Sequence, residues 1–365
     1  MNVDVNNFVT FDADTYSVSN DIPDFDAEVW AIEPYADDNA VFVGGEFSDV
    51  DGVSNSDRLV KLNADGSVDP SFDASFNNGR VMDLHMYEGP AGDMLFVGGS
   101  AGQKLMALDP DTGDNTGYID LGIQDEVAPN AFGDVSVNNF AISPDHTRLV
   151  AVGNFKTVAG QSRYRAFMAD LPEDSGQQAT LSEWYYQPFE RTCSSTVARR
   201  LAYLTDVDFS PDSSYFVVVA TGFISTQDSV DRGIVTVCDA AARFETPLTP
   251  GDMDPSQPTW INYAAGDTIW SVVATGAAVY VQGHFKWLDA APRGCCDHPG
   301  PNAVERRGIG AIGPATGQAL PWAPAKPARQ GGKQLLATPD GLWVVSDSKR
   351  FKGEPRYGIA FAPLP

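Results

Sequence analysis

One short pattern recurs six times along the chain: an apolar strand, then small residues, then in most copies a phenylalanine. The copies read VFVGGEF (41–47), LFVGGSA (95–101), AVGNF (151–155), VVVATGF (217–223), VYVQGHF (279–285) and LWVVSDSK (342–349). Their last residues lie 54 to 68 positions apart. A recurring unit of this length indicates a repeat architecture with one supersecondary unit per repeat.

Each unit contains further strands. An apolar stretch precedes each copy, as in EVWAIEP and RVMDLHM, and another follows and ends in a turn, as in LVKLNADGS and GIGAIGPATG. DG and ATG turns between alternating apolar residues are typical of hairpins. With a fourth, variable stretch, each unit predicts a blade of about four antiparallel strands. The sequence therefore predicts an all-β fold, a single β-propeller over residues 1–365 with six blades, or seven with one degenerate. A solenoid is the other repeat architecture, but no shorter period is present.

The two ends of the chain suggest how such a ring would close. The N-terminal run FVTFDADTYSV (8–18) is similar to the late strands of a unit, and the C-terminal run resembles the first three strands of one. A propeller must hide its open sheet edges. We therefore expect N- and C-terminal strands to share one blade.

The composition of the chain argues against several classes of binding partner. The formal charge is −25, which disfavours binding to nucleic acid or to anionic lipid. No stretch approaches the 18 apolar residues of a membrane span, so no membrane insertion is expected. The first residues lack the basic and apolar regions of a signal peptide. The chain is therefore expected to be either cytosolic or a mature form.

A family resemblance favours the mature form over the cytosolic protein. The stretch VGGEF…LVKLNADGSVDPSF resembles the delta-60 repeat of secreted bacterial proteins. The C-terminal half, from DVDFSP to TPDGLWVVSD, is similar to exported actinobacterial propeller proteins of unknown function. The resemblance implies a secreted or cell-surface protein, often attached to other surface modules. It implies no catalytic residue, since a fold alone does not assign a function.

The chain has four cysteines. Cys193 precedes the fourth unit and Cys238 is placed on its third strand, so a disulfide between them is expected. It would close a 45-residue loop. In the chain-entropy model such a disulfide stabilises the folded state by about 4 kcal/mol. Cys295 and Cys296 could form a vicinal disulfide or remain thiols. A metal site with His298 is disfavoured, because zinc sites commonly use CxxC spacing.

Two families of catalytic signature are absent from the sequence: it contains no HExxH and no Walker motif. The GG pairs follow strands and are interpreted as tight packing sites. The acidic turns 48–57, 109–117 and 252–256 do not complete an EF-hand, so their side chains are expected to cap their own turns. No cofactor is predicted. The alternative is that at least one of these turns holds a calcium ion.

Topology places the candidate ligand site. The starts of first strands and the ends of second strands meet on one propeller face, which also carries the long loops 48–57, 223–232 and 286–307. We interpret the mixed charge there as a ligand bowl. The alternative is that these side chains satisfy strand ends, and His284 in particular is expected to be hydrogen-bonded at the rim. The candidate residues are Glu28, Glu46, Arg80, Asp206, Asp267, His284, Trp287, Asp289 and Lys333.

Two functions remain open at this point. The first is a non-enzymatic binding or adhesion scaffold for a carbohydrate or a protein. The second is a hydrolase or lyase acting on a polysaccharide or a lactone at the channel mouth, which would require paired acids. The missing catalytic motifs favour the first.

Overall fold

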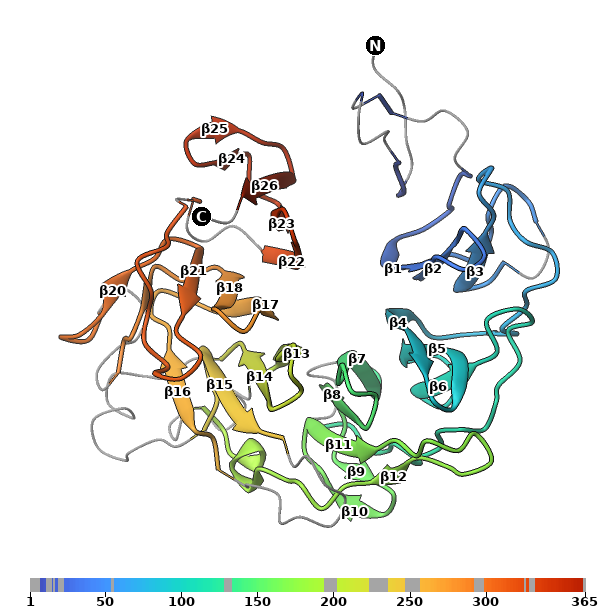
Figure 1. Ribbon diagram of the computed structural model, residues 1–365, viewed down its shortest axis with the longest axis horizontal. Helices are drawn as coiled ribbons and strands as arrows, with labels where there is room; N and C mark the ends of the chain where they lie inside the picture. Colours follow the sequence, from blue (N-terminus) through green and yellow to red (C-terminus); the bar gives the residue numbers. More distant parts are fainter. Residues whose placement is uncertain are drawn as a thin grey trace.

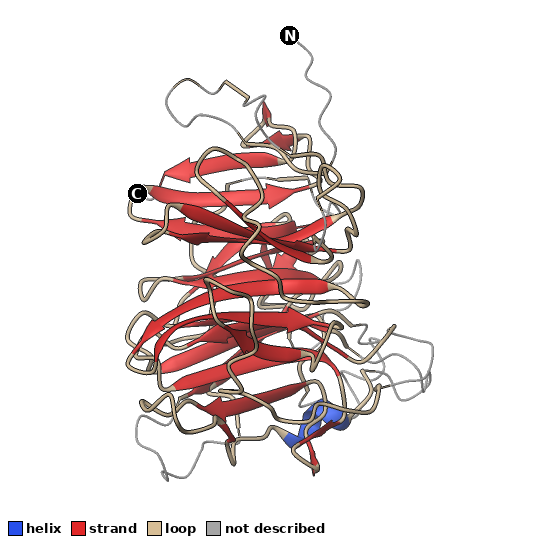
Figure 2. Cartoon of the chain, turned by 90° about the vertical axis from the view of Figure 1, so that its right-hand side faces the viewer, coloured by secondary structure: helices blue, strands red, loops and turns tan. Residues whose placement is uncertain are grey.

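The computed structural model describes residues 7–10, 15, 17–18, 23–53, 56–127, 133–193, 202–222, 236–246, 257–291, 299–324, 326–327 and 332–363. This part of the chain is almost entirely strand and loop, and its one helix is the short 3-10 helix η1 (Gln187–Glu190) (Figure 2). The predicted all-β class is confirmed. No described helix is long and apolar enough to cross a membrane.

Six antiparallel sheets of three or four strands follow one another along the chain. The first three sheets comprise β1 (Val29–Tyr35), β2 (Ala40–Gly45) and β3 (Leu59–Leu62); β4 (Val81–Gly89), β5 (Gly92–Gly99) and β6 (Leu105–Leu108); and β7 (Ser136–Ile142), β8 (Arg148–Asn154), β11 (Ala166–Asp170) and β12 (Thr180–Leu181).

The last three sheets comprise β13 (Leu204–Phe209), β14 (Tyr215–Ala220), β15 (Ala240–Glu245) and β16 (Trp260–Tyr263); β17 (Ile269–Ala274), β18 (Val279–Gly283) and β21 (Ile309–Ile312); and β22 (Gly332–Thr338), β23 (Gly341–Ser346) and β26 (Ile359–Pro363). Three small hairpins extend the loops between second and third strands: β9 (Thr157–Val158) with β10 (Gln161–Ser162), β19 (Trp287–Leu288) with β20 (Val304–Glu305), and β24 (Arg350–Phe351) with β25 (Glu354–Pro355).

The fourth strand of each unit is variable, as the sequence indicates. Two sheets have a full fourth strand. Three others have a single bridge in its place, at Val68, Asn115 and Ala319. In the described part of the chain, only the last sheet has neither, so the outer edge of β26 is open.

The sheets are arranged around a central axis as propeller blades (Figure 1). The first strand of each sheet lies innermost, and each first strand contacts the first strand of the next sheet. Apolar clusters fill the interfaces between successive sheets; Phe96 and Phe140, for example, belong to the cluster between the second and third. This stacking of sheets around a channel is that of a β-propeller.

The glycine pairs mark these interfaces, as expected. A side chain at Gly98 would place its Cβ 2.9 Å from the Phe140 ring of the next sheet. A side chain at Gly99 would collide with the carbonyl oxygen of Arg80. The GG pairs therefore let the second strand approach both its own first strand and the following blade.

The predicted disulfide is confirmed. Cys193 and Cys238 are bonded, with their Cα atoms 5.9 Å apart and both side chains fully buried. One detail of the prediction was wrong: β15 begins at Ala240, so Cys238 precedes the third strand of its sheet rather than lying on it. Cys295, Cys296 and His298 lie outside the described residues.

Closure of the ring is not confirmed. The ribbon is open between the first and last sheets (Figure 1), and β26 belongs to a sheet with β22 and β23 alone. The described N-terminal residues lie instead beside the first sheet, where Phe25 forms a bridge with Val50. Five residues of the run 8–18 that was expected to share the last blade, 11–14 and 16, lie outside the described residues.

Candidate functional site

A β-bulge interrupts every first strand at the same place. The register of each first strand against its second strand shifts across one residue, which has no partner. The six unpaired residues are Trp30, Met82, Asn138, Thr205, Trp270 and Lys333. Bulges of this kind re-aim a side chain and are frequent at rims and near binding sites.

Two of these bulge residues are large and exposed. Trp270 is 37% exposed and Trp30 is 43% exposed. β17 contacts β13 of the preceding sheet and β22 of the next, and the Trp270 side chain stays partly exposed between these neighbours. Neither tryptophan was predicted as a site residue, because nothing in the sequence marks which position of a strand is bulged.

The residue after the bulge has a structural role. Asp83, Asn139 and Asp206 each accept a backbone N–H from the first strand of the next sheet, at 2.8, 3.2 and 2.8 Å. First strands are sheet edges whose N–H groups need acceptors. Asp206, a predicted ligand residue, is 4% exposed and joins two blades.

Two further carboxylates, two positions along, do the same. Glu33 accepts the N–H of Met86 and Asp208 that of Ala274, both at 2.8 Å. We call these five acceptors, Glu33, Asp83, Asn139, Asp206 and Asp208, the inter-blade brackets. They line successive blades below the channel mouth and hold neighbouring first strands in register.

Burial and mutual proximity perturb the acids among the brackets. Burial raises the pKa of Asp208 to about 6 and that of Asp206 well above its usual range. Burial disfavours the charged form of His85, but Asp83, Glu33 and Asp208 outweigh it and raise the pKa of His85 to about 9. The His85 Nε2 lies 3.6 Å from a carboxylate oxygen of Asp83.

The predicted residues of the first two blades come together. The Arg80 Nε lies 2.6 Å from the Glu46 carboxylate. The backbone of Glu46 donates to the carbonyl of Glu28 at 2.9 Å, so all three belong to one part of the mouth. The Arg80 and Glu46 side chains are 51% and 33% exposed, which leaves the pair accessible to a ligand.

A second group forms in the fifth blade. The His284 Nδ1 lies 3.8 Å from the Asp267 carboxylate, and the His284 ring meets Trp270 edge-on with centroids 6.0 Å apart. The backbone N–H of His284 donates to the carbonyl oxygen of Thr268 at 2.9 Å, and the hydrogen bonding of its side chain at the rim stays a prediction. Lys333, the bulge residue of the next blade, is exposed. We call Asp267, Trp270 and His284 the fifth-blade group.

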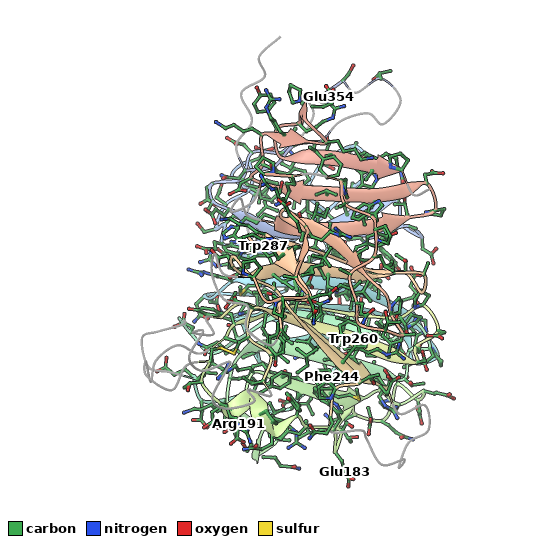
Figure 3. All side chains as sticks on the ribbon, turned by 90° about the vertical axis from the view of Figure 1, so that its left-hand side faces the viewer. Glu183, Arg191, Phe244, Trp260, Trp287 and Glu354 are labelled. Atoms are coloured by element: carbon green, nitrogen blue, oxygen red, sulfur yellow. A yellow bond between two sulfur atoms is a disulfide. The ribbon has the colours of Figure 1, made fainter. Side chains whose placement is uncertain are left out.

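Two predicted residues do not join this group. Asp289 accepts from the Asn262 amide at 2.6 Å and from the backbone N–H of Ala319, so it joins β16 of the fourth sheet to the Ala319 segment of the fifth. Trp287 lies on the β19–β20 hairpin, with the Lys286 ammonium 5.5 Å from its ring (Figure 3). Both lie along the long loop of the fifth blade rather than at its inner strand.

In two of the acidic turns, an aspartate side chain accepts backbone N–H groups of its own turn. Asp49 accepts the backbone N–H of Gly52, and Asp109 accepts those of Asp111 and Thr112. In the described residues no three His, Cys, Asp or Glu side chains converge as metal ligands. The turn 252–256 and the loop 223–232 lie outside them, as do parts of 48–57 and 286–307. Calcium remains an untested prediction.

Comparison with known proteins supports the fold. A family model described as a domain of unknown function (DUF5122) β-propeller matches residues 37–72, within the first repeat. No curated protein matches the chain.

Solved structures resemble the chain at low identity. A chain of the hydrazine synthase of Kuenenia stuttgartiensis is 12% identical, with a TM-score of 0.51 over 98% of this chain and 89% of that one. A chain of the mitotic checkpoint complex is 11% identical, with a TM-score of 0.45 over 94% and 74%. Likeness at this level shows the fold alone.

Proposed function

We propose that this β-propeller is an exported, non-enzymatic binding or adhesion scaffold that recognises a carbohydrate or a protein through its loop-bearing face. The observation that carries the proposal is the recurring bulge, which gives the channel mouth an exposed indole at Trp270 beside polar groups. An aromatic ring next to charged side chains suits ligands with both apolar and hydroxyl surfaces. The buried disulfide is compatible with an oxidising compartment.

The blade number is part of this proposal. We take the six sheets as six blades, and the opening beside the last sheet as the place of an incomplete seventh. This is the alternative that the sequence left open.

A hydrolase or lyase acting on a polysaccharide or a lactone is the second candidate. The Asp267–His284 pair favours it, because a carboxylate that orients an imidazole is a common acid–base arrangement. Product release from soluble glycans or lactones, lost in His284→Ala, would select this candidate over the scaffold.

The binding proposal is tested on a glycan and protein array. We expect Asp267→Ala or His284→Ala to weaken binding at least tenfold, and the thermal midpoint to stay nearly unchanged because both side chains are partly exposed. Asp93→Ala is the matched control, since Asp93 is exposed at the β4–β5 turn on the opposite face. Unchanged affinity in both mouth variants, or a ligand bound on the opposite face, would refute the proposal.

A further inference from the structure

Exposed apolar side chains gather at one place in this molecule. Among the described residues, the large hydrophobic side chains exposed to solvent are Val9, Val18, Trp30, Ile32, Tyr203, Trp270, Leu336, Val345, Tyr357, Ile359 and Phe361. All but Tyr203 and Trp270 belong to the first sheet, the last sheet or the segments next to them. Concentrated exposure of this kind marks an interaction surface.

The last sheet contributes one whole face. Leu336, Trp343 and Phe361 are paired across its three strands and therefore share a face, as do Val345 and Ile359. The Trp343 and Phe361 rings lie 5.0 Å apart. We call this surface the last-sheet face.

The opposite side of the last sheet is already used. Leu335, Leu342, Val344, Ala360 and Ala362 are buried against the fifth blade. In every propeller blade both faces pack against neighbours. In the part of the chain that the structure describes, no neighbouring blade covers the last-sheet face.

The first sheet is different, because its outer half is covered. Phe25 packs against Phe47 with centroids 4.8 Å apart, and Phe8 packs on Phe25 at 5.3 Å. What remains open is the inner strand β1, where Trp30 is 43% and Ile32 is 53% exposed. Among the described residues, the inner strand of the first sheet is therefore the part left uncovered.

The two surfaces together define the missing piece. It must be apolar on both faces, because it meets β1 on one side and the last-sheet face on the other. It must occupy the inner part of a blade, which in the other units is the hairpin of first and second strands. We propose that the opening is a docking site for a β-hairpin donated by a partner protein.

Charge specifies that partner further. Residues 1–57 contain no lysine or arginine, whereas cations outnumber acids among the exposed charges of the last sheet: Lys333, Lys349, Arg350, Lys352 and Arg356 against Asp340, Asp347 and Glu354. The donated hairpin therefore carries acidic residues on the side that meets the last sheet.

A second copy of this chain fits the opening less well. Each of its sheets has at least one face packed against its own neighbour, so none can present two free faces. Its own last-sheet face carries the same excess of cations and would meet a like charge.

The test uses the intact protein and a labelled synthetic hairpin of residues 29–45. This peptide is apolar on both faces and carries three acids and no base. We expect saturable binding by fluorescence anisotropy, weakened at least tenfold by Leu336→Glu or Phe361→Glu. Tyr203→Glu is the matched control for Phe361→Glu, because these aromatic side chains are 38% and 37% exposed and Tyr203 lies in another blade.

Three outcomes would overturn the proposal. One is a lack of saturable binding, and another is binding that the scrambled peptide reproduces or that the last-sheet variants leave unchanged. The third is a stable dimer in sedimentation that Phe361→Glu dissociates, since a second copy would then cover the face. None of these outcomes depends on glycan binding at the channel mouth.

Discussion

Single acidic side chains join the blades of this protein, and they do so at an electrostatic cost. Asp208 accepts a backbone N–H from β17 while burial raises its pKa to about 6. Its ordinary value is 3.8, so the folded chain holds this proton more tightly than the unfolded chain does. The contribution of Asp208 to the free energy of unfolding therefore increases as the pH falls from about 7 toward 4.

This sign gives a testable pH dependence. We expect Asp208→Asn to raise the free energy of unfolding at pH 7.5 by on the order of 2 kcal/mol, since the amide oxygen still accepts the N–H without a buried charge. The gain should shrink as the pH falls to 4, where the wild-type carboxyl is protonated. Urea unfolding of both proteins across this range measures the difference.

The pKa of His85 gives a second test of the charge on Asp208. Its pKa is raised to about 9, so its stabilising contribution is complete below its ordinary value and is lost as the pH rises through 9. Because Asp208 contributes to this rise, Asp208→Asn should also lower the pKa of His85 in NMR titrations. A difference between variant and wild type that is independent of pH would contradict the assignment.

The sequence could locate such residues but not their roles. Asp206 was predicted at the channel mouth as a ligand residue, whereas its carboxylate serves the next blade. The direction of a strand side chain depends on alternation, and one bulge shifts that alternation by a residue. The same shift exposes Trp270, which no feature of the sequence selects.

At the scale of strands and turns the sequence was more informative. Apolar alternation, turn residues and the GG pairs predicted which segments pair, because these signals are local. The role of Gly98 follows from its contact with Phe140 of the next blade, as the spacing indicated. The link between Cys193 and Cys238 was predictable because both flank one blade.

Removing this disulfide should weaken the fourth blade. We expect the Cys193→Ser, Cys238→Ser double variant to lose about 2–4 kcal/mol of unfolding free energy, because the unfolded chain gains the freedom of a 45-residue loop. Denaturant unfolding measures the loss. Reductant should destabilise the wild type by a similar amount and leave the double variant unchanged; equal sensitivity of both would contradict the prediction.

For the whole molecule, the repeat predicted a propeller but not whether its ring closes. Closure depends on the small rotation between successive blades, added over all of them, and no local sequence signal sets that sum. The similarity of the N-terminal run to late strands suggested a shared blade. In the described residues, Phe8 and Phe25 cover the outer half of the first sheet, and the last sheet remains uncovered.

An uncovered sheet should also be the least stable part of the ring. β22, β23 and β26 pack on one side only, whereas β14 and β15 have packed neighbours on both and a disulfide beside them. Local opening free energies follow the amount of buried apolar contact. We therefore expect backbone amides of residues 332–363 to exchange hydrogen at least tenfold faster than those of residues 215–220 and 240–245. Mass spectrometry of the exchanged peptides measures this, and saturating hairpin peptide should slow exchange in residues 332–363 and in β1, the two surfaces that it would contact. Uniform protection across all six sheets would mean that the last-sheet face is covered by the chain itself.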